Sequence, residues 1–241
     1  MRRGVLEAAA GIPQIIFPVF TNGTMFDEAS LNLFDKNRNL VPVISIEGDA
    51  AQTDARRGAG VYEKLTAAME AISERGILFG VSVTVTKENL KTVTERAYID
   101  ALRARGCRLA VFVEYVPVNE TSASAPDDAD RAELLRRIDD IRAQTDDFIL
   151  IAFPGDEDAL GGCLAAGRGF FHISPRGDAE PCPFSPFSDT NLKESSLKNA
   201  LASPLFRTLK LGGFLEGEHA GGCTLYEKEA RIRALIQPQQ E

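Results

Sequence analysis

Three cysteines in the last third of the chain have the residue type and the spacing to do chemistry. Cys163 and Cys182 bracket a segment whose strand, Pro-Arg-Gly-Asp turn and return strand predict a β-hairpin over residues 170–182. Cys223 follows a helical segment as part of a Gly-Gly-Cys sequence. This order can bring three sulfurs to one place. A third thiolate suits a metal ion or metal cluster better than it suits a disulfide pair.

The three thiols allow three interpretations. In the first, Cys163, Cys182 and Cys223 hold an iron–sulfur cluster, because thiolate sulfur is a soft, charged donor to iron. In the second, His219, four positions before Cys223, joins them in a tetrahedral zinc site of three sulfurs and one nitrogen. In the third, the thiols are buried and bind nothing.

Two other reactive residue types receive structural roles. His172 lies between Phe171 and Ile173 on the predicted strand, and we expect a core histidine bonded to the backbone. Cys107 begins an apolar strand and is expected to be a small buried hydrophobic residue outside the site. The sequence contains no Ser-His-Asp order, no P-loop and no dinucleotide fingerprint after a strand.

Composition limits the class of protein. A chain of 241 residues with 44% hydrophobic content can bury one large core, or one core and a satellite domain. The net charge of −8 argues against a nucleic-acid interface, which would need clustered Lys and Arg residues. No apolar run reaches the roughly 18 residues that a membrane span needs. Four cysteines without an export signal favour reduced thiols or metal ligands. We therefore expect a cytoplasmic α/β protein.

Strand and helix patterns alternate over the first part of the chain. Apolar runs predict strands at 14–20, 40–47, 77–86, 108–118 and 148–153. Helical patterns occupy 2–10, 31–37 (capped by Ser30), 61–74, 87–105 and 130–143, with a loop at 49–60. Helices are also expected at 192–201, 205–211 and 226–236. This alternation predicts parallel βα units with right-handed crossovers, and the run 14–20 predicts a strand covered on both faces.

Several of these segments resemble those of one enzyme family. The cysteine region has thirteen residues between Cys163 and Gly177 and four more before Cys182, followed by Pro-Phe. The matching strand ends are Val-Phe-Thr-Asn-Gly-Thr at 19–24, Val-Ile-Ser-Ile-Glu-Gly at 43–48, the loop at 54–62, Thr84 to Asn89, and Tyr-Val-Pro-Val at 115–118. Together they resemble radical S-adenosylmethionine (SAM) enzymes that carry a C-terminal twitch/SPASM domain, an auxiliary iron–sulfur domain.

The resemblance implies an α/β fold of two domains. Residues 1–153 would form an incomplete (β/α) partial barrel containing strands three to six. Residues 154–241 would form a small α+β twitch/SPASM-like domain. That domain would hold an auxiliary 4Fe–4S cluster on Cys163, Cys182 and Cys223. Its fourth iron position would be completed by a non-cysteine side chain or left open for substrate.

The resemblance also implies SAM contacts at the carboxyl ends of the barrel strands. Thr21 and Asn22 match the Thr-Asn-Gly segment, and Ser45 matches a serine that often contacts the amino acid portion of SAM. Arg57 would pair with the SAM carboxylate. Glu47, in place of the more usual aspartate, is expected to close its strand by accepting backbone hydrogen bonds. Glu114 and Tyr115 would point to opposite faces of their strand.

One motif of the family is missing. The three-cysteine loop CxxxCxxC, which holds the cluster that cleaves SAM, does not occur in the sequence. By the resemblance, two βα units are absent, about 60 residues at roughly 30 per unit. Strand 14–20 would then lack a neighbour. We expect the chain to aggregate, to self-associate through that edge, or to need a complementary N-terminal fragment.

The resemblance implies the activity of the complete enzyme. That enzyme would cleave SAM to a 5′-deoxyadenosyl radical and abstract hydrogen from a peptide or small metabolite, whereas this chain alone would not cleave SAM. An alternative of another class is a non-catalytic zinc-binding scaffold or interaction protein.

Overall fold

The computed structural model describes residues 3–117, 123–216 and 223–236 and divides the chain into two compact units. Unit 1 comprises the described residues of 3–115 and 123–153. Unit 2 comprises those of 116–117, 154–216 and 223–236. Among the described helices, none is both long enough and apolar enough to cross a membrane.

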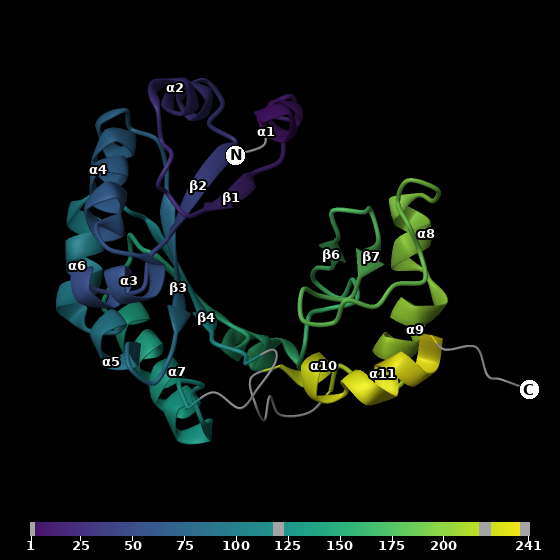
Figure 1. Cartoon of the computed structure of the whole chain (residues 1–241). Helices are drawn as coiled ribbons and strands as arrows, with labels where there is room; N and C mark the ends of the chain where they lie inside the picture. The colour runs from purple at the N-terminus through teal and green to yellow at the C-terminus, as the bar shows by residue number, and fades with distance from the viewer. Residues whose placement is uncertain (1–2, 118–122, 217–222, 237–241) are drawn as a thin grey trace, which may run out of the picture. The chain divides into compact units, whose positions relative to one another are not determined.

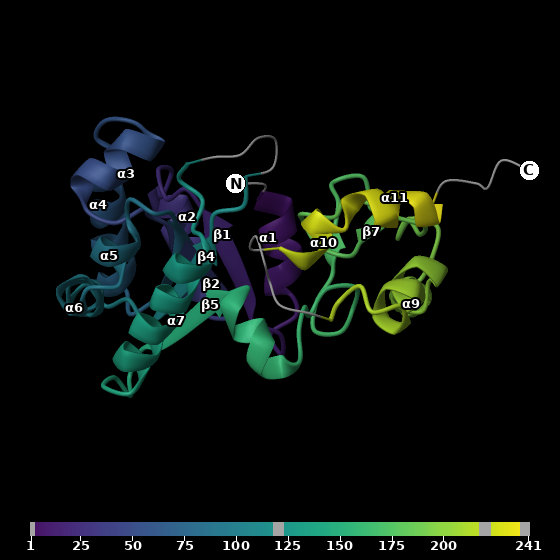
Figure 2. The same cartoon turned by 90° about the horizontal axis from the view of Figure 1, so that it is seen from below.

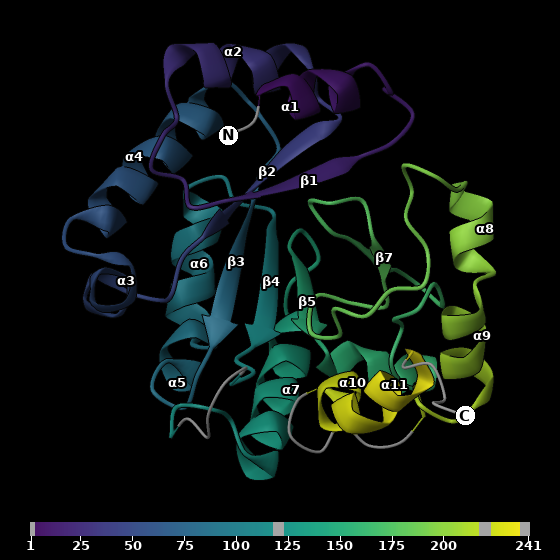
Figure 3. The same ribbon diagram turned by 45° about the vertical axis from the view of Figure 1, so that its right-hand side comes forward.

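Unit 1 is built on a five-stranded parallel sheet in the order β1-β2-β3-β4-β5. The strands are β1 Phe17–Thr21, β2 Leu40–Ser45, β3 Gly80–Val85, β4 Leu109–Glu114 and β5 Ile149–Phe153. Figure 3 shows β3, β4 and β5 side by side and running in the same direction. The parallel α/β architecture is as predicted. Residues 149–153 extend the same sheet, which therefore holds five strands and not only the four that the resemblance assigned to the barrel.

Helices pack on one face of this sheet. They are α1 Arg3–Ala10, α2 Glu28–Lys36, α3 Ala50–Arg57, α4 Val61–Glu74, α5 Leu90–Val93, α6 Arg96–Ala104 and α7 Asp128–Arg142. Figures 1 and 2 show α3, α4, α5 and α6 gathered on one side of the strands. Phe34, Phe79 and Phe112 are completely buried between the two layers. Burial of these large apolar side chains, together with the aliphatic residues of the same core, stabilises unit 1.

Three of the predicted helix boundaries were wrong for local reasons. The carboxylate of Asp27, and not Ser30, caps α2, and it accepts a hydrogen bond from the Ser30 N–H at 2.8 Å. The expected loop 49–60 contains α3, because Asp49 and Gln52 form a capping box. The expected helix 87–105 is divided into α5 and α6, because Glu95 has an extended backbone with φ −71° and ψ 139°.

β1 lies at an edge of the sheet. It begins at Phe17, three residues later than predicted, and Phe20 is 59% exposed. The prediction of a strand covered on both faces was therefore wrong. Within the described residues, β1 pairs only with β2.

Unit 2 contains short elements joined by loops. They are the 3-10 helix η1 Gly155–Leu160, β6 His172–Ile173, β7 Ala179–Glu180, α8 Leu197–Leu201, α9 Pro204–Leu211, α10 Thr224–Glu227 and α11 Glu229–Ile236. β6 and β7 pair in an antiparallel hairpin, which confirms that prediction. The expected helix 192–201 begins only at Leu197, and the terminal helix is divided at Lys228.

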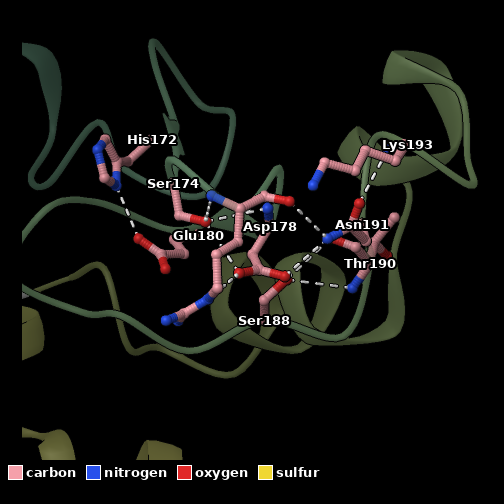
Figure 4. Close-up of polar contacts among 9 residues, drawn as sticks. His172, Ser174, Asp178, Glu180, Ser188, Thr190, Asn191 and Lys193 are labelled. Atoms are coloured by element: carbon pink, nitrogen blue, oxygen red, sulfur yellow. Dashed lines mark hydrogen bonds and ion pairs between the residues drawn. The ribbon is translucent and has the colours of Figure 1, made fainter.

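The hairpin turn is fixed by one aspartate. The Asp178 carboxylate accepts hydrogen bonds from the Ser174 hydroxyl and from the Asn191 amide, both at 2.9 Å (Figure 4). These bonds hold the pKa of Asp178 below its usual value. Gly177 adopts φ +95°, which the turn requires. The turn therefore positions β7. It also positions Cys182, which lies two residues after the end of β7.

Candidate functional site

Three thiols come together in unit 2. Cys163 follows η1, Cys182 follows β7, and Cys223 is the N-cap residue of α10. The residues are 6%, 3% and 9% exposed. The thiols of Cys182 and Cys223 are hydrogen-bonded to each other, and the charge of Cys163 acts on both. The structure thus brings together the three cysteines that the sequence singled out.

Backbone hydrogen bonds hold the three segments in place. The Cys163 N–H donates to the Leu215 carbonyl at 3.0 Å, and the Ala166 N–H donates to the Pro181 carbonyl at 3.1 Å. Gly162 makes the first contact possible. It has φ +99°, and a Cβ there would lie 2.5 Å from the Leu215 oxygen. The approach of these segments therefore depends on glycine at position 162.

Each sulfur accepts a hydrogen bond from the backbone N–H two residues later. The donors are Ala165 for Cys163, Phe184 for Cys182, and Leu225 for Cys223. The Tyr226 N–H adds a second bond to Cys223. Hydrogen bonds to sulfur stabilise the thiolate form and tune the potential of iron–sulfur centres. The local backbone is therefore suited to three thiolate ligands.

The thiols do not ionise independently. Burial is the main cause that raises the pKa of Cys163 to about 12. The hydrogen bond from Cys182 lowers the pKa of Cys223, and the same bond, together with burial, raises the pKa of Cys182. The buried pair therefore gives up a first proton and retains the second. Three thiolates require a compensating positive charge, which a metal centre supplies.

Residues of the described ranges do not form a site for a single metal ion. Within 3–117, 123–216 and 223–236, no group of three or more Cys, His, Asp or Glu side chains is arranged around one such position. His219, the fourth ligand of the zinc interpretation, lies outside the described residues. A four-iron cluster is larger than one ion, and each thiolate would bind a different iron. The three sulfur donors and their N–H bonds fit such a cluster.

Sequence reasoning missed a carboxylate beside these thiols. Glu157, in the first turn of η1, is 3% exposed, and its Oε1 accepts a hydrogen bond from the Leu164 N–H at 3.1 Å. Its side chain is hydrogen-bonded to the Cys163 thiol, and its charge also acts on Cys223. Residues 155–160 have no apolar periodicity that would have predicted a helix. Glu157 comes close to Cys163 only because of how the loop folds, so no signal in the sequence indicated this contact.

His172 has a different partner from the one predicted. Its Nδ1 lies 2.7 Å from Oε2 of Glu180, its register partner on β7 (Figure 4). The Glu180 side chain is 7% exposed and the His172 side chain 37%. The expectation of a core histidine bonded to backbone was therefore wrong. Histidine and glutamate form an ion pair when the imidazole is protonated, on the strand pair that leads into Cys182.

The predicted SAM contacts lie in unit 1, where two of them shape a turn. The Gly23 N–H donates to the Thr21 hydroxyl at 3.2 Å, and the Thr24 N–H donates to the Asn22 amide oxygen at 3.3 Å. Ser45 is the last residue of β2 and stands opposite Ser82 of β3. All three predicted contacts are therefore at the carboxyl end of the sheet, where parallel α/β proteins bind ligands.

Arg57 forms an ion pair with Glu47, which lies at the same carboxyl end of the sheet. Its guanidinium lies 2.5 Å from the Glu47 carboxylate, which is 2% exposed, and Arg56 lies 3.4 Å from the same oxygen. Glu47 therefore closes its strand through two arginines and not through backbone bonds as predicted. Arg56 also lies 5.5 Å from the centre of the Tyr115 ring. Glu114 pairs with Arg131 at 3.0 Å and is buried.

The Glu47–Arg57 ion pair leaves one acceptor atom and one donor atom available for further hydrogen bonds. Oε2 of Glu47 and Nε of Arg57 are buried and have no hydrogen-bond partner among the described residues. One atom is an acceptor and the other a donor. A ligand group that both donates and accepts, such as the α-amino acid portion of a small molecule, would satisfy both.

Comparison with known proteins identifies the fold. No protein-family model and no curated protein matches the sequence. Among solved structures, SuiB from Streptococcus suis matches with a TM-score of 0.67 at 16% identity, over 86% of this chain and 53% of that chain. SuiB bound to S-adenosylmethionine matches with a TM-score of 0.68 at 16% identity, over 86% and 53%. The protein anSMEcpe with bound AdoMet matches with a TM-score of 0.62 at 15% identity, over 90% and 71%.

These neighbours are radical SAM enzymes, and the chain has their α/β fold. The chain spans about half the length of SuiB. At these identities the similarity concerns the fold, so the chemistry has to be argued from the side chains.

Proposed function

We propose that this chain is part of a radical SAM enzyme, in which unit 1 contributes to the SAM-binding barrel and unit 2 holds an auxiliary 4Fe–4S centre. The observation that carries the proposal is the group of three buried cysteines, each with a backbone N–H on its sulfur. The fold shared with SAM-bound neighbours supports the proposal that unit 1 contributes to a SAM-binding barrel.

The protein's contribution to the centre is charge and geometry. Cys163, Cys182 and Cys223 bind as thiolates, and the N–H groups of residues 165, 184 and 225 stabilise their charge. When bound, a 4Fe–4S cluster supplies one-electron chemistry or an iron at which a substrate can bind. Leu205, Phe206 and Leu225 belong to the same buried core as the three cysteines and would shield the centre from water.

Anaerobic reconstitution with iron and sulfide tests the auxiliary centre. We expect a brown protein with about four irons and four sulfides per chain, as a 4Fe–4S cluster requires. Serine variants of the three cysteines should lose that colour, and Cys107→Ser should keep it. A colourless chain that binds one zinc ion would instead support the non-catalytic scaffold, with His219 as fourth ligand.

The SAM contacts of unit 1 are a second part of the proposal. Thr21, Asn22 and Ser45 would line the cofactor at the sheet edge, and Arg57 would bind its carboxylate. The unpartnered atoms of Glu47 and Arg57 match the ammonium and carboxylate of an amino acid. Calorimetry with SAM should show binding that Arg57→Ala weakens by about tenfold or more, the loss of one charge-assisted hydrogen bond. Arg38→Ala, a surface control, should leave the affinity unchanged.

SAM cleavage requires a complementing segment in this proposal. The 241 residues contain no CxxxCxxC motif, and the outer edge of β1 has no strand paired with it in the described part of the chain. We expect no 5′-deoxyadenosine from this chain with dithionite. We expect product when a segment carrying that motif and two βα units is supplied. Product from the chain alone would contradict the proposal. Dimers through β1 that the segment does not dissociate would support self-association instead.

A peptide is the proposed substrate class. SuiB has been solved with the precursor peptide SuiA, and anSMEcpe with the Cp18Cys peptide. Photo-crosslinking of the reconstituted protein to a peptide library, compared with a library of small metabolites, tests this proposal. Crosslinks formed only with metabolites would contradict it.

A further inference from the structure

Two arginines at the carboxyl end of the unit 1 sheet share one carboxylate. Arg57 lies 2.5 Å and Arg56 lies 3.4 Å from Oε1 of Glu47, whose side chain is 2% exposed. Among the described residues, Glu47 is the only acidic side chain that forms an ion pair with either arginine. Two guanidinium groups and one carboxylate therefore carry one positive charge that the described part of the chain does not neutralise.

The two arginines differ in how far a ligand can reach them. The side chain of Arg57 is 24% exposed, whereas that of Arg56 is 42% exposed. The Arg56 guanidinium lies over the ring of Tyr115, with its Cζ 5.5 Å from the ring centre. A guanidinium held over an aromatic ring can still donate the N–H groups of its edge, and that edge fits the two oxygens of a carboxylate.

We propose that Arg56 recognises a carboxylate of the peptide substrate, which it binds as a bidentate ion pair while its guanidinium packs on Tyr115. The inference rests on the proposed peptide substrate and adds the chemical group by which that peptide is recognised. The carboxylate belongs either to an acidic side chain or to a free C-terminus, since both present the same two oxygens.

The amino acid portion of SAM does not account for this charge. In the proposed function its carboxylate binds Arg57 and its ammonium binds Oε2 of Glu47, the two sites that have atoms without a hydrogen-bond partner among the described residues. These two groups of SAM have opposite charges, so their binding leaves the charge of Arg56 uncompensated. The molecule that must lie beside SAM is the substrate, and a substrate with a carboxylate would neutralise Arg56.

The acidic side chains that neighbour this group in the sequence serve the fold. Asp54 accepts hydrogen bonds from two backbone N–H groups at the start of α4, both at 2.8 Å, and Asp49 caps α3. Glu114 pairs with Arg131 at 3.0 Å. A carboxylate from outside would therefore compete at Arg56 with Glu47 alone among the acidic side chains of the described residues.

Fluorescence anisotropy with three labelled peptides of equal length tests the assignment. The first peptide contains one glutamate and an amidated C-terminus, the second has glutamine in place of the glutamate, and the third has that glutamine and a free C-terminus. We expect the wild-type chain to bind one of the two charged peptides about tenfold more tightly than the neutral one, the effect of one charge-assisted ion pair. The preferred peptide identifies the source of the carboxylate.

Variants of Arg56 assign the preference to this side chain. Arg56→Gln should bind the three peptides equally. Arg56→Lys keeps the charge but loses the two-pronged N–H edge, so it should retain only part of the preference. The matched control is Arg38→Gln, because Arg38 is 51% exposed, pairs with Asp35 and precedes β2 at the opposite end of that strand. The control should keep the full preference.

Phenylglyoxal labelling of the wild-type chain keeps the test decisive if a variant does not fold. This reagent modifies accessible arginines, and mass spectrometry locates them. A charged peptide, or the dicarboxylate glutarate, should protect Arg56 and not Arg38. Equal binding of the three peptides by the wild-type chain would overturn the carboxylate site and leave the peptide substrate standing. Protection by glutarate without binding of any peptide would overturn the peptide substrate and leave the site standing. No binding and no protection would overturn both.

Discussion

Unit 1 buries large aromatic and aliphatic side chains against one face of a five-stranded sheet, whereas unit 2 mixes such side chains with three cysteines and several alanines among two-residue strands and short helices. The interior of unit 1 includes Phe34, Phe79 and Phe112, all completely buried. That of unit 2 includes Ala165, Ala166, Ala179, Ala200 and the three cysteines. Small side chains remove little apolar surface from water, so each contributes little to stability.

The difference indicates what each unit needs in order to fold. The apolar interior of unit 1 is sufficient to stabilise its fold. The charged residues at the carboxyl end of its sheet add to that stability but are not needed for it. In unit 2 the groups that meet at the centre are thiols and a carboxylate, which repel one another once ionised. Binding of a metal centre would therefore contribute directly to the folding free energy of unit 2. The predictions below test whether the two units respond separately.

The largest effect is expected from a cysteine of the proposed centre. Cys182→Ala should abolish the visible absorbance of the reconstituted protein and make residues 163–216 and 223–236 exchange deuterium rapidly, because the centre would lose a ligand. The strands of unit 1 should keep their protection. Cys107→Ala, which removes a buried thiol from unit 1, should keep the absorbance. If amide hydrogens of both units lost protection against deuterium exchange to the same extent, the two units would not be responding separately.

The converse variant is in the core of unit 1. Phe112 is 0% exposed in the middle of β4, and Phe112→Ala should lower the free energy of unfolding of unit 1 by about 3–5 kcal/mol. Iron content and visible absorbance should stay at wild-type values. Phe20→Ala, at a position 59% exposed, should change stability by less than about 0.5 kcal/mol. Denaturant unfolding followed by absorbance and by circular dichroism distinguishes these outcomes.

A smaller effect is expected at the charged edge of the sheet. Glu47→Ala leaves Arg57, whose side chain is 24% exposed, without its carboxylate partner. The free energy of unfolding of unit 1 should fall by about 1–2 kcal/mol, because Arg57 loses its partner but is still partly reached by water. Glu70→Ala on the exposed face of α4 is the matched control and should be nearly neutral. A neutral Glu47→Ala would show that water solvates Arg57 adequately.

The smallest effect is a pH-dependent one at the surface of unit 1. The hydrogen bond from Lys87 lowers the pKa of Asp127, the N-cap of α7, to about 2. The resulting stabilisation is complete above the unfolded value of about 4 and disappears as the pH falls through about 2. Asp127→Asn should therefore melt below wild type at pH 7 and approach it as the pH falls below about 2. A difference in melting temperature that persists unchanged in acid would contradict this ionic origin.

Much of the fold was predictable because its signals are local. The apolar positions of α4 recur at helical spacing, and the structure places that helix at Val61–Glu74, as predicted. The Pro-Arg-Gly-Asp turn likewise gave the hairpin. By contrast, α3 has one buried residue, Thr53, so no apolar stripe indicated a helix there. Its capping box was the signal that could have found it.

The candidate site was predictable in its cysteines and not in its carboxylates. The cysteines stand out by residue type and by their position around a hairpin. The positions of Glu157 beside Cys163 and of Glu47 beside Arg57 follow from how loops close after folding. Acidic residues are common in this chain, so nothing in the sequence distinguishes these two from those that face solvent.

Ala166 is the only non-glycine residue of the described ranges with a left-handed backbone, at φ +53°, and it is completely buried. A larger side chain there would have to adopt an unfavourable left-handed backbone and also find room in a completely buried position. A library randomised at codon 166 and screened for brown colonies should consequently return alanine and glycine almost exclusively. The choice of amino acid at position 166, in the loop after Cys163, would thus be limited in evolution by backbone conformation and space, although this residue takes part in no reaction.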